Sequence, residues 1–334
     1  MTEKLSEIGG NGKSWTRINV PTSAFRSIYY GDGMWVACGN YANSGLYYST
    51  DGKNWEISNA NSDDFYSVYY ENGLWVASGN GSGLYYSTDG KTWARSNLTF
   101  GIFKPFYHDI WVAASGLVSG LWYSIDGKEW LPSNITNGSY DSIYYGNGLW
   151  VAVSGDHADK GILYSIDGKN WVQSNVINGS FSSVYYGNGM WVAGGISDNG
   201  LYYSTDGMKW ERSNIPVGYL YTVYYANGLW VAGGYTGLYY STNGMNWFRI
   251  KITRGNFNSI CYANGIWIAG SNGDGLYYST DGKNWTQSDI SEGWFYSVYY
   301  ADGIWVAGGI SGTGLYYSEL TIKDDTKQIE EVAY

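Results

Sequence analysis

The chain has 334 residues, of which aromatic residues make up 19% and charged residues only 14%. This composition excludes intrinsic disorder, which requires few aromatic residues and high charge, and no apolar run reaches the length of about 18 residues that a membrane-spanning helix needs. The formal net charge of −10 argues against a protein that binds duplex DNA, since such proteins neutralise phosphates. We therefore expect a globular protein with no nucleic-acid partner and no membrane span.

Residues 1–10 read as a short lead without an apolar core, so the sequence predicts no secretory signal. A cytoplasmic location is then the default, with a phage particle or the cell surface as the alternatives. The first run that we expect to be structured is NGKSWTRI, over residues 11–18. It opens with a string, Asn-Gly-x-x-Trp, that returns along the whole chain.

The strings Asp-Gly-x-x-Trp and Asn-Gly-x-x-Trp together end at eight tryptophans that are 37 to 41 residues apart: Trp15, Trp55, Trp93, Trp130, Trp171, Trp210, Trp247 and Trp285. A second series of eight tryptophans alternates with the first: Trp35, Trp75, Trp111, Trp150, Trp191, Trp230, Trp267 and Trp305. A fixed period of this length is typical of solenoids, arrays and propellers. The chain is therefore predicted to repeat one small structural unit eight times.

Residues 65–97 represent this unit, and they contain four short runs rich in Tyr, Trp, Val and Thr, which favour strands. The runs cover residues 65–70, 74–78, 84–88 and 92–96. Asn72-Gly73 separates the first two runs and Asp89-Gly90 the last two, and both dipeptides favour tight hairpin turns. Because no helical spacing of apolar residues persists, the unit predicts four antiparallel strands.

Eight units of this kind predict an all-β fold, an eight-bladed β-propeller of four-stranded antiparallel blades. Residues 11–320 would form this single domain, and residues 321–334 a charged C-terminal tail. A linear β-array is the alternative. The last unit supplies three runs and lacks the fourth, which residues 11–18 can provide from the other end of the chain. We therefore predict that an N-terminal strand completes the last blade and closes the ring.

The string Ser-x-Asp-Gly-x-x-Trp occurs in six copies, and Asn243 replaces the Asp in a seventh. The motif resembles the Asp box of BNR and sialidase-type propellers, in a form one residue shorter, and the resemblance covers about residues 11–320. It implies a turn between the third and fourth strands, away from the face that carries the active site in that family. We expect these side chains to bond to backbone N–H groups and to be structural: Asp51, Asp89, Asp126, Asp167, Asp206 and Asp281.

The connections of the units differ in how much they vary. The second loop and the link to the next unit, which share one edge of a four-stranded meander, vary among copies, whereas the other two turns are nearly constant. Loops on a rigid scaffold usually carry function. The second residue of the first strand also varies, and we expect it to surround the mouth of the central channel, with Lys104 and Ser182 among its members. A solvated and unconstrained position is the alternative interpretation. The predicted ligand-binding residues, which include aromatics at the rim, are Arg26, Tyr66, Asp141, Tyr219, Tyr221, Tyr235, Asn258, Trp294 and Tyr296.

Catalytic groups are sparse in this pattern. A sialidase needs converging arginines, but four of the six arginines fall two residues after a serial tryptophan, in the outermost strand. A glycosidase needs two facing carboxylates, and Asp141 is the only acidic member of the predicted channel ring. The two histidines, His108 and His157, are too few and too far apart for a zinc site. We therefore predict no enzyme activity, no metal and no cofactor.

Two functions remain, both non-catalytic. The main prediction is a monomeric, lectin-like propeller that binds a glycan on the variable face, where exposed Tyr and Trp would stack on sugars and repeated blades would provide several sites. The alternative is a protein-interaction or structural scaffold, as in a phage or cell-surface assembly, with a protein partner on the same loops. The charged tail favours this alternative slightly.

Overall fold

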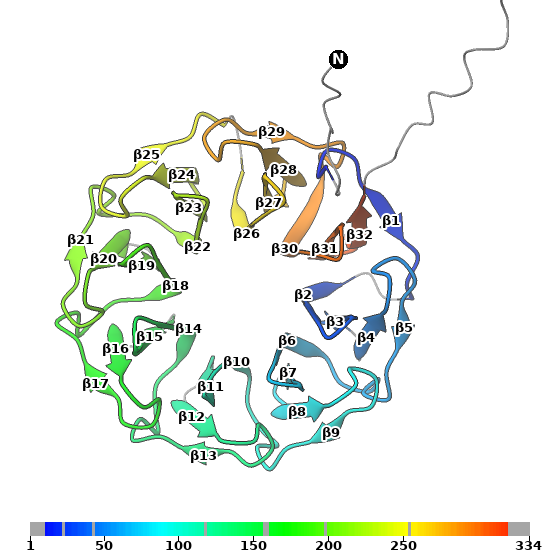
Figure 1. The fold of residues 1–334 in the computed structure, drawn as a ribbon, viewed down its shortest axis with the longest axis horizontal. Helices are drawn as coiled ribbons and strands as arrows, with labels where there is room; N and C mark the ends of the chain where they lie inside the picture. The colour runs from blue at the N-terminus through cyan, green and yellow to red at the C-terminus, as the bar shows by residue number, and fades with distance from the viewer. Residues whose placement is uncertain are drawn as a thin grey trace, which may run out of the picture.

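The computed structural model describes residues 11–21, 24–41, 44–116, 119–155, 160–196, 199–252 and 255–319. The predicted lead, residues 1–10, and the predicted tail, residues 321–334, lie outside this range. The described residues contain no α-helix, and strands β1 to β32 form antiparallel sheets that surround a central axis (Figure 1). None of their segments is a helix long and apolar enough to cross a membrane. The architecture is that of a β-propeller, as the repeat predicts.

Each repeat runs outward from the axis in chain order (Figure 1). The inner strands are β2 (Phe25–Gly31), β6 (Phe65–Glu71), β10 (Phe103–His108), β14 (Tyr140–Gly146), β18 (Phe181–Gly187), β22 (Leu220–Ala226), β26 (Phe257–Ala263) and β30 (Gly293–Ala301). The second strands are β3 (Met34–Gly39), β7 (Leu74–Gly79), β11 (Ile110–Ser115), β15 (Leu149–Ser154), β19 (Met190–Gly195), β23 (Leu229–Gly234), β27 (Ile266–Gly273) and β31 (Ile304–Ile310).

The two outer positions hold shorter strands. The third strands are β4 (Leu46–Ser49), β8 (Leu84–Ser87), β12 (Leu121–Ser124), β16 (Ile162–Ser165), β20 (Leu201–Ser204), β24 (Gly237–Ser241), β28 (Leu276–Ser279) and β32 (Gly314–Ser318). The fourth strands are β1 (Thr16–Ile18), β5 (Glu56–Ile57), β9 (Ala94–Arg95), β13 (Leu131–Pro132), β17 (Val172–Gln173), β21 (Glu211–Arg212), β25 (Phe248–Arg249) and β29 (Thr286–Gln287).

Six of the repeats form separate four-stranded sheets, and the remaining eight strands form one larger sheet, here called the joined sheet. It contains β26–β29 together with β30–β32 and β1. The two halves meet because β27 and β30 are the longest strands of their kind, with 8 and 9 residues. Their extra residues pair with each other, Asn272 opposite Trp294 and Gly273 opposite Gly293.

The N-terminal strand β1 pairs antiparallel with β32, with Thr16, Arg17 and Ile18 opposite Tyr317, Tyr316 and Leu315. Trp15 and Ile18 are buried on opposite sides of this sheet, in two different hydrophobic clusters. The backbone N–H of Gly12 donates to Ser318 Oγ at 3.2 Å, and Lys53 of the first sheet pairs with Glu319 just beyond β32. Both ends of the described chain therefore lie in one sheet, and that sheet contacts the sheet of the first repeat, β2–β5.

The hydrophobic core consists of separate clusters between neighbouring sheets. All six residues of a second strand such as β7 are buried, because both of its faces pack against other sheets. The second tryptophan series lies in these strands and is at most 2% exposed. Its rings contact the inner strand of the preceding sheet edge-on, as Trp75 does with Tyr29 at 6.4 Å between ring centroids. Aromatic content thus serves mainly to pack sheet on sheet.

The two predicted turns differ in structure. Asn72 and Gly73 both have positive φ, at 52° and 75°, which is the signature of a tight type I′ hairpin. At Asp89-Gly90 only the glycine has positive φ, and β8 ends at Ser87 while β9 begins at Ala94. The predicted tight turn is therefore wrong here. A longer loop replaces it and shortens the fourth strand to two residues.

Each of these longer loops is built around its Asp side chain. Asp89 Oδ1 accepts the backbone N–H groups of Lys91 and Thr92 at 2.8 and 2.7 Å, and Trp93 Nε1 donates to Gly90 O at 3.0 Å. The other five aspartates of the motif bond in the same way. Gly90 has a φ of 71° and lies against Met34 of the preceding sheet, so a side chain there would be strained and crowded. The motif therefore folds its own loop and seats it on the neighbouring sheet.

These bonds predict how the protein responds to acid. Partial burial works against the charged form of Asp51, but the N–H groups of Asn54 and Lys53 outweigh it, and its pKa falls to about 2; Asp167 and Asp281 behave alike. A lowered pKa contributes stability that is present above pH ~4 and is lost as the pH falls to about 2. We expect the triple variant Asp51→Asn/Asp167→Asn/Asp281→Asn to unfold at a lower pH than the native chain in an acid titration followed by near-UV circular dichroism.

An amide keeps its acceptor oxygen at every pH, as Asn243 shows by accepting from Met245 N and Asn246 N at 3.0 and 2.9 Å. The matched control is therefore Asn243→Asp, which should move the acid midpoint upward. Equal midpoints in all three proteins would show that the turn carboxylates do not govern acid unfolding.

Asparagines link neighbouring sheets in what we call the lateral ladder. Asn134 Oδ1 accepts the backbone N–H of Trp171 at 2.8 Å, and its Nδ2 donates to Trp171 O at 3.0 Å. The same pair of bonds forms at four other junctions: Asn59–Trp93, Asn97–Trp130, Asn175–Trp210 and Asn214–Trp247. At a sixth junction Asp289 takes this place and accepts Trp15 N at 3.1 and 3.2 Å.

The ladder has two interruptions among the described residues. Lys251 takes the asparagine position before Trp285, and Asn19 stands there before Trp55 but forms no such pair of bonds with it. Within the described residues, neither Trp55 nor Trp285 has a side-chain partner for its backbone. Both are only half-buried, whereas the tryptophans in the ladder are at most 7% exposed. The two interruptions lie on either side of the joined sheet.

Candidate functional site

The variable position of the inner strands is a β-bulge. In β2, Phe25 lies opposite Gly39 and Ser27 opposite Cys38, so Arg26 has no partner in the ladder of strand pairs. The same shift occurs in six other inner strands, at Tyr66, Asp141, Ser182, Tyr221, Asn258 and Tyr296. A bulge redirects the side chain of its extra residue. This explains why the second residue can vary while its neighbours hold the strand in place.

Strand β10 is the exception, because it pairs with β11 without a shift and is one residue shorter. Its register places Lys104 opposite Ala114 and Pro105 opposite Ala113, as Ser67 and Val68 pair in β6, so β10 lacks the bulge residue. Phe106 thereby still reaches the position that Tyr69 and Tyr144 hold in the neighbouring sheets, with ring centroids 5.2 Å from each.

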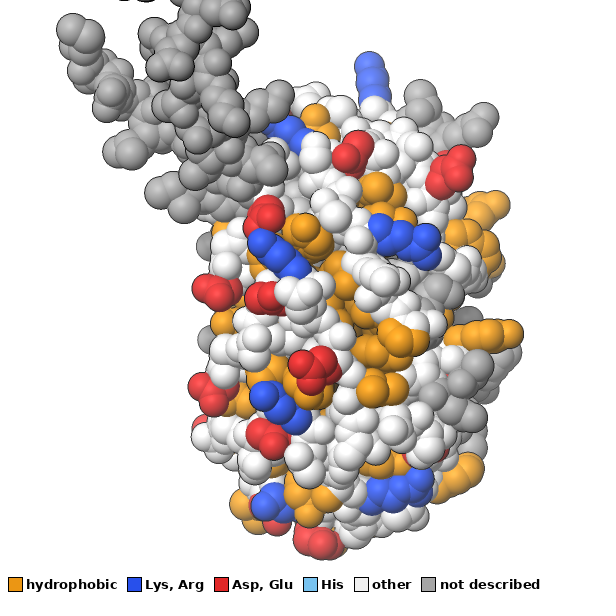
Figure 2. Space-filling view, turned by 90° about the vertical axis from the view of Figure 1, so that its right-hand side faces the viewer, with side chains coloured by type: hydrophobic (Ala, Val, Ile, Leu, Met, Phe, Trp, Pro, Cys, Tyr) orange, Lys and Arg blue, Asp and Glu red, His pale blue; other side chains and the backbone are white. Residues whose placement is uncertain are grey.

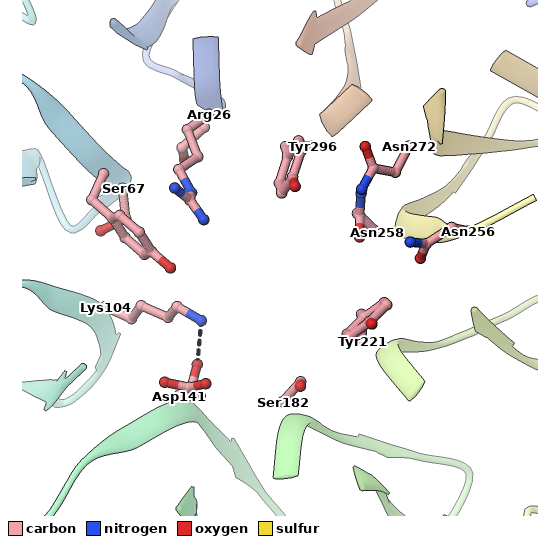
Figure 3. Close-up of a pocket in the computed structure, with 12 residues that line it drawn as sticks. Arg26, Ser67, Lys104, Asp141, Ser182, Tyr221, Asn256, Asn258, Asn272 and Tyr296 are labelled. Atoms are coloured by element: carbon pink, nitrogen blue, oxygen red, sulfur yellow. Dashed lines mark hydrogen bonds between the residues drawn. The ribbon is translucent and has the colours of Figure 1, made fainter. Parts of the chain in front are cut away.

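The bulge residues line one pocket of about 550 Å³ around the axis (Figure 3). Its lining includes the eight variable residues. Six of them were predicted to bind a ligand: Arg26, Tyr66, Asp141, Tyr221, Asn258 and Tyr296. Four further residues line it: Ser27, Ser67, Asn256 and Asn272. The volume is in the usual range for ligand pockets, about 300–1,000 Å³. The structure thus brings the predicted channel residues together.

One sector of the pocket is cationic. The guanidinium of Arg26 lies 4.3 Å from the ring centroid of Tyr66 and 5.3 Å from that of Tyr296, so two rings hold it. Lys104 Nζ lies 5.9 Å from the same Tyr66 ring and donates to the backbone carbonyl of Asp141. Among the described residues, neither cation forms an ion pair with a carboxylate. Both side chains point into the open centre of the pocket (Figure 3).

The opposite sector is formed by amides. Asn256 precedes β26, Asn258 is its bulge residue, and Asn272 reaches the pocket from β27, so the three side chains lie side by side (Figure 3). Asn256 Oδ1, Asn258 Nδ2 and Asn272 Oδ1 are buried without a hydrogen-bond partner within the described residues. Buried polar atoms are normally bonded, because desolvation without a partner costs about 1–3 kcal/mol. This sector therefore contains hydrogen-bonding atoms that no described group uses and that are closed to solvent.

An aromatic belt surrounds the axis below the pocket. Each member lies three residues beyond the bulge residue of its inner strand, or two residues beyond Lys104 in β10. Three residues of strand place it about 10 Å deeper along the axis than the bulge residue. The members are Tyr29, Tyr69, Phe106, Tyr144, Tyr185, Tyr224, Cys261 and Tyr299. Neighbouring rings are 4.5 to 5.2 Å apart from Tyr299 round to Tyr224. Burial raises the pKa of Tyr69 and of the Cys261 thiol to about 12. The belt thus forms an uncharged layer beneath the pocket at neutral pH.

The predicted rim aromatics lie outside the pocket lining. Tyr219 and Tyr235 form an edge-to-face pair with centroids 6.4 Å apart, and they are 42% and 65% exposed. Trp294, beside the junction of the joined sheet, is 43% exposed. Further large apolar residues are exposed on the links between sheets, and the sequence reasoning missed them: Phe100, Ile177 and Val217. An apolar residue in a link whose other copies are polar is the signal that could have found them.

Backbone hydrogen bonds join the variable connections to each other. Gly45 N donates to Asp63 O at 2.9 Å, and Asn80 N donates to Asp64 O at 2.7 Å, so a link contacts the second loops of both adjoining sheets. The Asp-containing loops lie at the other end of the strands. In the side view, apolar side chains project along one edge of the ring and acidic ones gather along the other (Figure 2). The two faces therefore differ in chemistry.

Comparison with known proteins places the fold only. No protein-family model matches the chain, and no curated protein matches it. Among solved structures, a computationally designed protein, Ika8, is similar with a TM-score of 0.72 and 11% identity over 91% of this chain and 98% of its own. Sqt1 of Saccharomyces cerevisiae has a TM-score of 0.69 and 8% identity over 93% and 100%. YCF48 bound to D1 peptide has a TM-score of 0.58 and 16% identity over 92% and 97%.

Proposed function

We propose that this chain is a non-catalytic protein-interaction propeller whose partner docks on the variable face, over the central pocket. The observation that supports this best is the exposure of large apolar side chains on that face, around a polar pocket. Tyr235, Phe100 and Val217 are 65%, 70% and 59% exposed, at positions where single copies of the repeat depart from the others. Exposed aromatics rimmed by polar residues are typical of protein interfaces.

The comparison with YCF48 supports the same proposal, because that propeller of similar fold is described in complex with a peptide. The proposal reverses the order of the two sequence-based hypotheses, since no finding favours the lectin-like function. A glycan remains the second candidate on the chemistry of Trp294 and Tyr296 alone. The non-catalytic character is also part of the proposal: among the described residues, Asp141 is the only carboxylate in the pocket lining, whereas glycoside hydrolysis uses two.

The scaffold in this proposal is an eight-bladed ring with the shortened Asp-box repeat, closed by β1 in the last blade. The pairing of β1 with β32 supports closure, and so does the bond from Ile28 N to Ser297 Oγ at 3.0 Å. The ring contact between Tyr29 and Tyr299 joins the same two sheets at 4.9 Å. A closed ring would hold the loops of the variable face at fixed spacing, which favours recognition of one partner shape.

Site-specific photo-cross-linking tests the partner and its face. A benzoylphenylalanine at Tyr235 should capture one protein in the source cell, whereas the same group at Ile166, which is 76% exposed in an Asp-containing loop, should not. With that protein purified, Tyr219→Ala/Tyr235→Ala/Trp294→Ala should weaken binding at least about 30-fold, since truncating an interface aromatic often costs 2 kcal/mol or more. The control variant is Ile125→Ala on the opposite face.

Three results would contradict the proposal. Equal capture from both faces would remove the assignment of the face, and unchanged affinity of the triple variant would remove the named side chains. Binding on a glycan array that the triple variant abolishes, without any captured protein, would restore the lectin-like function.

A further inference from the structure

The pocket combines two sectors that differ in chemistry, and together they define what a bound segment must present. We propose that the pocket receives a carboxylate of the partner on Arg26 and Lys104, while the amides of Asn256, Asn258 and Asn272 bond to the adjoining peptide groups. This inference rests on the proposed function, because it takes the partner to be a protein, and it adds the class of chemical group that the partner inserts.

The charge distribution carries the first half of the argument. The chain has a formal net charge of −10, yet the described residues that line its central pocket include two cations and one carboxylate. Arg26 and Lys104 share the ring of Tyr66, so two like charges lie close together without an acidic partner among the described residues. Such an arrangement is unfavourable until an anion enters. The Lys104 ammonium bonds to a carbonyl of the neighbouring sheet and leaves two of its three N–H donors available.

The geometry of Arg26 favours a carboxylate over other anions that a protein could present. Tyr66 and Tyr296 contact the guanidinium from two neighbouring inner strands and restrict its orientation before any ligand arrives. A planar guanidinium presents paired N–H donors that match the two oxygens of a carboxylate. Preorganisation lowers the entropic cost of binding. The unbound pocket is therefore already arranged for a carboxylate.

The amide sector carries the second half. Its three unpartnered atoms, two carbonyl oxygens and one NH₂ nitrogen, offer acceptors and a donor in one cluster. A peptide group needs both, because it has one N–H and one C=O. A side-chain amide can also turn its oxygen or its nitrogen toward a partner, which adapts the cluster to either direction of the peptide. These atoms are closed to solvent in the unbound pocket, so the amide groups would turn to bond a short segment whose carboxylate lies at the other end of the pocket.

The carboxylate can come from the C-terminus of the partner or from an Asp or Glu side chain, and three fluorescein-labelled octapeptides distinguish these sources. The first has an internal Glu and an amidated C-terminus, the second replaces Glu with Gln, and the third combines Gln with a free C-terminus. Fluorescence anisotropy with up to 1 mM protein measures their affinities. We expect the first or the third peptide to bind and the second to bind at least about tenfold more weakly, which corresponds to one charge-assisted hydrogen bond.

Variants then separate the two sectors. Arg26→Gln should weaken binding of the charged peptide about tenfold and reduce its dependence on salt, whereas Asn258→Leu should weaken binding and leave the salt dependence unchanged. The matched control is Arg212→Gln, because Arg212 also lies over a tyrosine ring, at 5.4 Å from Tyr202, but on an outer strand. Thermal melting of each variant verifies that it folds.

Equal binding of all three peptides, no binding at 1 mM, or an unchanged affinity in Arg26→Gln would each overturn the inference. None of these results affects the proposed function, which stands or falls with the protein captured from position 235. Conversely, carboxylate-dependent peptide binding without a captured protein would leave the pocket assignment intact and remove the proposed cellular role.

Discussion

Deletion of residues 1–18 is expected to lower the free energy of unfolding by about 5 kcal/mol or more, measured by urea denaturation with tryptophan fluorescence. The deletion removes Trp15, which is 7% exposed, and truncation of a buried aromatic alone costs about 3–5 kcal/mol. It also removes Ile18 and every hydrogen bond between β1 and β32. The outer edge of β32 would then be free to pair with another chain, so we also expect aggregation in size-exclusion chromatography.

Two matched variants separate closure from a general effect of truncation. Deletion of residues 1–9 keeps Trp15 and the whole of β1, and it should leave the midpoint of unfolding unchanged. A rearranged chain that carries residues 11–20 after Glu319, instead of at the N-terminus, supplies the same strand from the other end and should recover most of the lost stability. A fully stable 1–18 deletion would show that the ring does not depend on this strand.

The lateral ladder gives the second large effect. Asn134→Ala should lower the free energy of unfolding by about 2–3 kcal/mol, because two hydrogen bonds are lost and the backbone of Trp171 is left without these partners at a buried position. Asn134→Asp keeps the acceptor and loses the donor, so it should fall between the native chain and the alanine variant. Urea denaturation at neutral pH gives the three values.

Asn19→Ala is the matched control for this prediction, since Asn19 occupies the same place in the repeat and is exposed, as Asn134 is, but among the described residues it forms no such pair of bonds with Trp55. Its effect should stay within about 0.5 kcal/mol, as for most surface substitutions. If Asn19→Ala and Asn134→Ala lower the free energy of unfolding equally, asparagine at this position serves the loop conformation rather than the bonds between sheets.

The sequence predicts the strands, their order and the ring of channel residues, because the repeat presents the same pattern eight times. It does not predict the bulges. Strands that are buried on both faces lack the alternation of apolar and polar residues that would mark an extra residue, so nothing in FRSIYY around Arg26 indicates that this side chain leaves the ladder. The variability of the position was its only visible trace.

The pocket was predicted in part, and the omissions have a common cause. Asn256 and Asn272 reach it from a link and from the end of a second strand, not from the repeated inner position. Asn272 pairs with Trp294 where β27 and β30 extend into glycine-containing connections, so this pairing joins two different repeats. Such loops look alike in sequence whether or not they pair, because contacts between repeats leave no periodic pattern.

The two interruptions of the lateral ladder divide the ring into an arc of six sheets and the joined sheet. Arg26, Lys104 and Asp141 belong to the arc, whereas Asn258 and Tyr296 belong to the joined sheet. A segment bound to both sectors of the pocket would therefore connect the arc to the joined sheet, between which the ladder is interrupted. Binding would then brace the ring itself: the occupied protein should resist opening at these junctions, and its stability should rise with the concentration of the partner.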